Sequence, residues 1–141
     1  MQISWNQFKG YWIDPVNGGW QKPPLGYMKL NVDEGFRDGQ GTFGGVLRDD
    51  EGNVKWGFSG KSSAGDALHA ELIAMKIGLQ ALLDKNCSRI LVETDSSQTV
   101  NLLHSIPDEL HPWQDVIWDC KKIKQNIWNC VVDYIPRNAM C

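Results

Sequence analysis

The chain has 141 residues, of which 42% are hydrophobic and 22% charged, proportions typical of one globular domain with a sizeable core. Its net charge of -3 and pI near 5.5 provide no electrostatic argument for nucleic-acid binding, which a strongly basic chain would have done. The sequence shows no signal peptide, and no apolar run reaches the roughly 18 residues that cross a bilayer. We therefore expect an intracellular protein, nuclear or cytoplasmic, that has no membrane segment.

Residues 1–25 are expected to form a tail or linker ahead of one domain that occupies residues 26–141. Tryptophans alternate with polar residues in this tail, and breaker sequences such as Lys22-Pro-Pro-Leu-Gly26 interrupt any regular pattern. These tryptophans could dock on the domain itself or on a neighbouring molecule, and the sequence does not distinguish the two.

Three antiparallel strands are predicted over residues 28–36, 42–49 and 53–60. In the first, Leu30 and Val32 alternate with polar residues, which is the two-residue period of a half-buried strand. The sequence Asp49-Asp-Glu-Gly-Asn53 is typical of a tight turn between the second and third strands. Gly44 and Gly45 inside the second strand indicate a bulge or a close approach by another backbone.

A loop is predicted over residues 60–65 and a long helix over residues 66–85, with Asp66 in the position of its N-cap. Apolar side chains recur along this helix at helical spacing and predict one buried face. They are Leu68, Leu72, Met75, Leu79 and Leu82.

The second half of the chain is predicted to form a strand, two helices and a final strand, over residues 89–95, 98–105, 113–127 and 128–135. Ser96 and Ser97 can cap the first of these helices. The order helix, strand, helix implies a parallel crossover, so we expect an α/β fold with a mixed five-stranded sheet flanked by helices. The second helix carries Lys121, Lys122 and Lys124 on its polar side, which is either a solvated face or a nucleic-acid contact.

Three carboxylates stand in positions that suggest a shared site. Glu71 has apolar or small neighbours three and four positions away on its helix, so its burial should cost free energy or raise its pKa. Asp95 lies where a parallel strand ends and a helix begins, which is where sites gather in α/β sheets. If the first strand is central, Asp33 can converge with both. The spacing of these residues along the chain is equally consistent with one shared site and with three unrelated carboxylates.

A converged set of carboxylates would favour a metal ion. Two such charges about 4 Å apart repel by roughly 4 kcal/mol at an effective dielectric constant near 20, and a divalent cation removes this penalty. Oxygen ligands without histidine or thiolate suit magnesium or manganese. The chemistry that fits is metal-assisted transfer of a phosphoryl group to water.

Five short segments occur in a defined order along residues 22–141. They are Lys29-Leu-Asn-Val-Asp33, Gly44-Gly-Val-Leu-Arg-Asp49, Ala70-Glu-Leu-Ile-Ala74, Glu93-Thr-Asp-Ser96 and Ile135-Pro-Arg-Asn138. Taken together, they resemble the ribonuclease H domain of plant non-LTR retroelements and their host-gene relatives. The resemblance implies a ribonuclease H-like fold and a metal-dependent endonuclease that cuts the RNA strand of RNA/DNA hybrids.

The same resemblance implies roles for individual residues. Asp33, Glu71 and Asp95 match the first three acidic residues of the family and would hold two Mg²⁺ (or Mn²⁺) ions. Ser96 and Arg137 are candidates for nucleic-acid contacts, together with the three lysines named above. The hybrid would be recognised by its shape, 2′-hydroxyls and phosphates rather than by base edges.

The chain departs from the family pattern in three ways. The fourth family carboxylate, which follows the Pro-Arg-Asn segment, does not occur before Cys141, so we expect an incomplete domain that lacks its final helix. Asp133 lies too early to replace that carboxylate. Glu34 stands where the family usually has glycine and adds a charge near the site. The histidine that some members carry near the last helix is not visible, and His111 lies too far upstream.

These departures leave alternatives open. The first is a catalytically silent module of the same fold that binds nucleic acid or a protein partner. The second is another member of the polynucleotidyl transferase superfamily, such as an exonuclease or an integrase. His69 and Glu71 also match the H-x-E of zinc deaminases, but the Pro-Cys-x-x-Cys partner motif is missing and the two side chains would point about 200° apart on a helix. The sequence does not indicate an oligomeric state.

Overall fold

The computed structural model describes residues 21–137, so most of the predicted tail, with its three tryptophans, lies outside the described residues. The elements are β1 (Met28–Arg37), β2 (Gln40–Arg48), β3 (Val54–Ser63), α2 (Ala67–Asp84), β4 (Ile90–Thr94), α3 (Ser97–His104), α4 (Gln114–Gln125) and β5 (Cys130–Tyr134). This is the predicted order of strands and helices. No helix in the described part of the chain is long and apolar enough to cross a bilayer.

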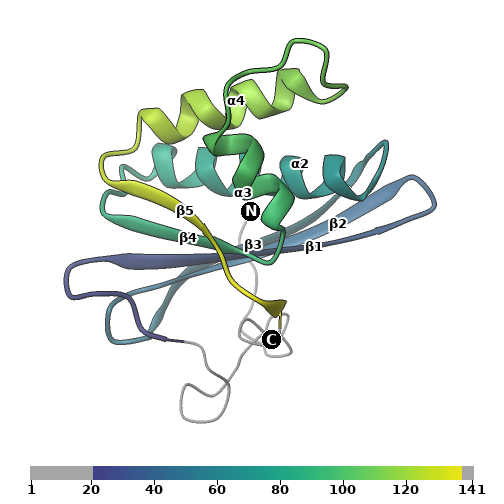
Figure 1. Ribbon diagram of the computed structural model, residues 1–141. Helices are drawn as coiled ribbons and strands as arrows, with labels where there is room; N and C mark the ends of the chain where they lie inside the picture. The colour runs from purple at the N-terminus through teal and green to yellow at the C-terminus, as the bar shows by residue number, and fades with distance from the viewer. Residues whose placement is uncertain (1–20, 138–141) are drawn as a thin grey trace.

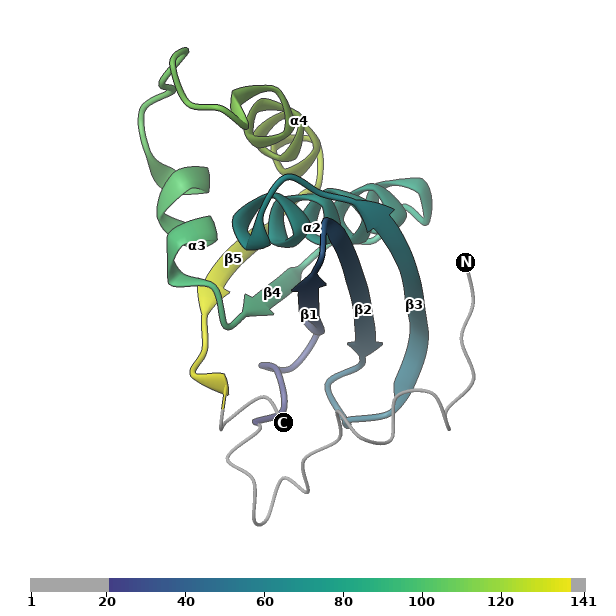
Figure 2. The same cartoon turned by 90° about the vertical axis from the view of Figure 1, so that its right-hand side faces the viewer.

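The strands form one mixed sheet in the order β3-β2-β1-β4-β5. The first three strands are antiparallel, whereas β4 pairs in parallel with both β1 and β5. The predicted α/β architecture is therefore confirmed, and β1 is the central strand, which is the condition for Asp33 to approach Glu71 and Asp95. Figures 1 and 2 show α2, α3 and α4 on the same side of the sheet, with α4 outermost.

The core lies between the sheet and α2. Leu30 and Val32 of β1 are fully buried, as the two-residue period predicts, and they pack in one cluster with Met75, Leu79 and Leu82 of the apolar stripe of α2. Asp66 caps α2, because its side chain accepts a 2.7 Å hydrogen bond from the backbone N–H of His69. Ser96 caps α3 in the same way, with Thr99 as the donor.

The predicted loop over residues 60–65 is wrong in its first part. β3 continues to Ser63 because β2 already begins at Gln40, and these two residues are partners in the antiparallel register. The sequence around Ser63 is rich in glycine and serine, which are typical of loops, but the backbone pairing with β2 extends the strand.

Gly45 of β2 is required for a different reason from the predicted one. A Cβ added at Gly45 would lie 2.2 Å from Cε1 of Phe58, so the close approach is made by a buried aromatic ring rather than by another backbone. The irregularity in the pairing of β2 with β3 lies between Leu47 and Arg48 and not at the glycines.

Candidate active site

The pairing of β1 with β4 brings Asp33 and Asp95 side by side, just beyond the last paired residues of these two strands. Val32 and Thr94 are partners in this parallel register, so each aspartate is the next residue along its strand direction. Because Val32 and Thr94 are both fully buried, Asp33 is directed to the opposite face of the sheet from α2.

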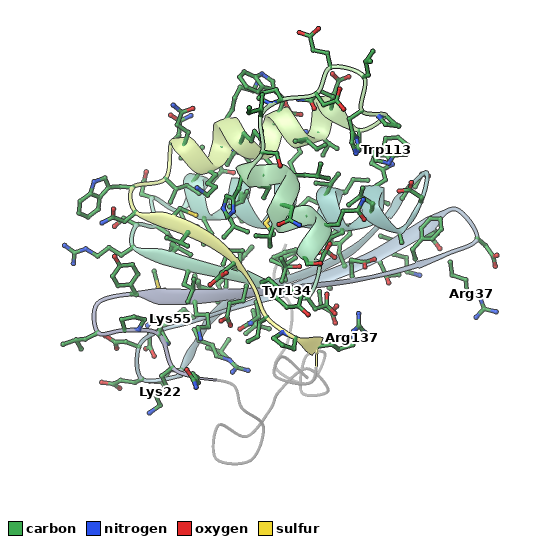
Figure 3. The ribbon with its side chains drawn as sticks, in the orientation of Figure 1. Lys22, Arg37, Lys55, Trp113, Tyr134 and Arg137 are labelled. Atoms are coloured by element: carbon green, nitrogen blue, oxygen red, sulfur yellow. The ribbon has the colours of Figure 1, made fainter. Side chains whose placement is uncertain are left out.

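Arg137 joins these two aspartates. Its Nε lies 2.7 Å from Oδ2 of Asp95, and its Nη2 lies 3.7 Å from Oδ1 of Asp33. The side chains of Asp33 and Asp95 are 14% and 8% exposed, whereas that of Arg137 is 67% exposed. Figure 3 shows Arg137 below the sheet, on the side away from the helices. One guanidinium, reaching in from solvent, thus offsets the repulsion between two largely buried carboxylates.

The environment of Asp33 combines opposing effects on its pKa. Burial raises the pKa of Asp33 most strongly, and the charge of Asp95 raises it further. A 2.8 Å hydrogen bond from the backbone N–H of Glu34 and the charge of Arg137 lower it. The net effect is a raised pKa, as expected for a carboxylate that is removed from water.

Glu71, on α2, approaches the same place in the sheet through its contact with Thr94, the last residue of β4. It is 1% exposed, and its Oε1 accepts a hydrogen bond from the hydroxyl of Thr94. Its Oε2 is buried and has no hydrogen-bond partner in the described part of the chain. Burial raises the pKa of Glu71 to about 8, the bond from Thr94 lowers it, and the charges of Glu34, Asp95 and Asp33 raise it. Burial and the nearby carboxylates therefore disfavour a negative charge on Glu71 unless a cation is added.

Two residues at this site were not assigned a role from the sequence. Thr94 orients Glu71, and its alternation with the buried Val92 along β4 is the signal that could have indicated this. Glu34 was recognised only as an extra charge, although its alternation with Leu30 and Val32 places it on the buried face. Its Oε2 is buried and has no hydrogen-bond partner among residues 21–137.

The donor chemistry of this cluster suits a divalent metal ion. The predicted ligands Asp33, Glu71 and Asp95 offer only carboxylate oxygens, and Oε2 of Glu71 is buried without a hydrogen-bond partner in the described part of the chain. A bound cation would supply that partner. Over residues 21–137, however, no three His, Cys, Asp or Glu side chains are already arranged as a metal-binding group. Arg137 instead engages the two aspartates, while Thr94 engages Glu71.

The other predicted nucleic-acid contacts lie apart from this cluster, except for Ser96. The hydroxyl of Ser96 is 2.8 Å from that of Thr99 and is engaged in capping α3. The three predicted lysines lie on α4, in the outer part of the helix layer (Figure 2). The ammonium of Lys121 donates a hydrogen bond to the backbone carbonyl of Ser105, and Nζ of Lys122 lies 3.6 Å from Oδ1 of Asp119.

His69 and Glu71 do not act together. The imidazole of His69 stacks on Trp113 with 3.9 Å between the ring centroids, and its Nδ1 accepts a hydrogen bond from the backbone of Gly65. Glu71 bonds to Thr94 on the opposite side of α2. The geometry agrees with the angular separation predicted from helical spacing.

Comparison with known proteins places this arrangement in a family. The model of the reverse transcriptase-like family matches residues 31–140. The Arabidopsis thaliana protein named "Putative ribonuclease H protein" is 32% identical over 123 residues, which is 86% of this chain. The match spans only 20% of that protein, so the chain corresponds to one part of a longer relative.

Solved structures confirm the fold. Ribonuclease H1 from Halobacterium salinarum superposes with a TM-score of 0.71 at 19% identity, covering 82% of this chain and 92% of its own. The compost-derived LC11 ribonuclease H1 in complex with an RNA/DNA hybrid has a TM-score of 0.71 at 20% identity, covering 81% and 88%. The chain therefore belongs to the reverse transcriptase-like family and carries a ribonuclease H-like domain of the plant retroelement type.

Proposed function

We propose that this domain is a divalent-metal-dependent endonuclease that hydrolyses the RNA strand of RNA/DNA hybrids. The observation that carries the proposal is the environment of Glu71, which is buried and oriented by Thr94. Within residues 21–137, one of its carboxylate oxygens has no hydrogen-bond partner. A domain that only needed to fold would gain free energy from an apolar residue there, because burial of an unpaired carboxylate is costly. The family membership supports the same activity.

Asp33, Glu71 and Asp95 would hold two Mg²⁺ ions, or Mn²⁺ in their place. When bound, these ions would supply an activated water and stabilise the charge that develops on the scissile phosphate. Thr94 keeps Glu71 in one orientation, and packing of α2 on the sheet holds its backbone in place. Arg137 reaches the aspartates from the solvent side, where its exposed guanidinium can also contact a phosphate.

The proposed partner is an RNA/DNA hybrid, and the hybrid-bound LC11 enzyme supports this choice because it shares the fold. With its hydroxyl engaged in the cap, Ser96 would contact phosphate mainly through the backbone N–H groups at the start of α3. The lysines of α4 would meet only the more distant part of a bound duplex. An intracellular location, nuclear or cytoplasmic, stays a prediction.

The test is hydrolysis of a labelled RNA/DNA hybrid in Mg²⁺ and in Mn²⁺. It compares this chain with a version extended by the acidic final helix of a family member, and each is also prepared as Asp33→Asn. Asp133→Asn is the matched control, because Asp133 lies exposed on β5 and is not a proposed ligand. We expect cleavage that Asp33→Asn abolishes and Asp133→Asn preserves. Cleavage that survives Asp33→Asn would refute the proposal.

A catalytically silent module that binds nucleic acid or a protein is the second candidate. It is favoured by the ion pairs that Arg137 makes with Asp33 and Asp95, and by the net charge of -3. The same hybrid distinguishes the two functions. Retention of the hybrid in a filter-binding assay without cleavage by either version would favour the silent module.

A further inference from the structure

Glu34 faces the helix side of the sheet. Its direct partner across β2 is Phe43, which belongs to the buried core, and residues paired across an antiparallel ladder share a face. Leu30 and Val32, two and four positions earlier on β1, point the same way and are fully buried. The side chain of Glu34 is therefore directed toward α2, where an ionised carboxylate needs a compensating group.

Neither glutamate is fully compensated in the described part of the chain, although Thr94 donates to Glu71 and the charge of Arg137 acts on Glu34. Oε2 of Glu34 and Oε2 of Glu71 are both buried without a hydrogen-bond partner, and the hydroxyl of Thr94 meets only Oε1 of Glu71. The fold places the two side chains at the same end of the β1–β4 ladder. Glu71 accepts a hydrogen bond from Thr94, which is the partner of Val32 in the parallel register. Glu34 is the next residue of β1 on the face that Val32 shares. A buried carboxylate oxygen without a donor favours a bound cation or a proton.

The strand end is thus lined by carboxylates on both faces. Asp33 and Asp95 lie on the open face with Arg137, whereas Glu34 and Glu71 lie on the helix face.

We propose that Glu34 is a fourth carboxylate ligand of the divalent cation, supplied by β1 itself and shared with Glu71. The proposal deepens the proposed function and rests on it, because it adds a ligand to the same site. It assigns a role to the residue that stands in place of the glycine expected from the family resemblance. Since the number of charged oxygen ligands tunes the affinity of such sites, Glu34 should tighten cation binding.

The test measures Mn²⁺ binding to the whole chain by isothermal titration calorimetry, with free Mn²⁺ followed by electron paramagnetic resonance. Glu34→Gln keeps the size of the side chain and removes its charge. Glu51→Gln is the matched control, since it makes the same change of net charge in the exposed turn after β2. We expect Glu34→Gln to weaken Mn²⁺ binding about tenfold or more, and Glu51→Gln to change it by less than about twofold. Unchanged or tighter binding to Glu34→Gln would overturn the proposal in favour of a shared proton.

A second variant keeps the test valid if Glu34→Gln does not fold. Glu34→Gly introduces the glycine of the family and should weaken binding by a similar factor. Asp33→Asn separates this proposal from the proposed function. If Asp33→Asn abolishes Mn²⁺ binding and neither variant of Glu34 affects it, only the role of Glu34 fails. If Mn²⁺ does not bind, or binds equally to Asp33→Asn, both the role of Glu34 and the metal-dependent function are refuted.

Discussion

Replacing Glu71 with Gln should make the stability of the metal-free protein less dependent on pH. In the folded protein, burial raises the pKa of Glu71 from 4.5 to about 8. Between these two values the folded state keeps a proton that the unfolded chain has released. The free energy of unfolding therefore falls as pH rises: the contribution of this proton is fully present below about 4.5 and is lost by about 8.

The size of the effect follows from the same two values. One proton released over one pH unit changes stability by about 1.4 kcal/mol, so the interval from 4.5 to about 8 corresponds to roughly 5 kcal/mol. Natural domains of this size are stable by about 5–15 kcal/mol, so this single side chain would dominate the alkaline side of the stability profile. Gln keeps an oxygen that can accept the hydrogen bond from Thr94 but does not titrate.

The assay is urea unfolding followed by circular dichroism at several pH values from 5 to 9, with EDTA present. Glu71→Gln should gain stability relative to the natural chain by about 1.4 kcal/mol per pH unit, up to about pH 8. Glu51→Gln, in an exposed turn, should show the pH dependence of the natural chain. A difference between Glu71→Gln and the natural chain that stays constant from pH 5 to 9 would refute the assigned environment of Glu71.

Three further predictions test neighbouring parts of the structure. Arg137→Gln should tighten Mn²⁺ binding about two- to fivefold in calorimetry, because a competing exposed cation is removed, whereas Arg37→Gln on the hairpin should have no effect. Thr94→Val should cost about 1–3 kcal/mol in urea unfolding, since it removes the donor to a buried glutamate oxygen; an unchanged midpoint would contradict that bond. Gly45→Ala should cost about 1–3 kcal/mol because of the clash with the ring of Phe58, and Phe58→Leu in the same chain should recover part of the loss.

Local patterns along the chain predicted most of the fold. The two-residue period of β1 and the helical stripe of α2 each identify a buried face, and both were confirmed because burial of apolar side chains determines which face packs inward. Prediction failed where composition and pairing disagree, as at Ser63, where loop-like residues continue β3 because β2 offers backbone partners. The sequence pointed to Gly45 as a special position. The reason that glycine is needed there is the ring of Phe58, which lies on β3 and cannot be inferred from the residues next to Gly45.

The sequence by itself determined the order and type of the elements, and by family resemblance it indicated Asp33, Glu71 and Asp95 as ligands, roles that stay predictions. Only the tertiary structure decided how these side chains meet. The parallel register of β1 with β4 brings the aspartates side by side, and the chain after β5 returns Arg137 to them. Register and helix placement depend on contacts between residues far apart in sequence, which no local period encodes. For the same reason, the lysines of α4 were grouped by their spacing but lie outside the carboxylate cluster, in the outer helix layer.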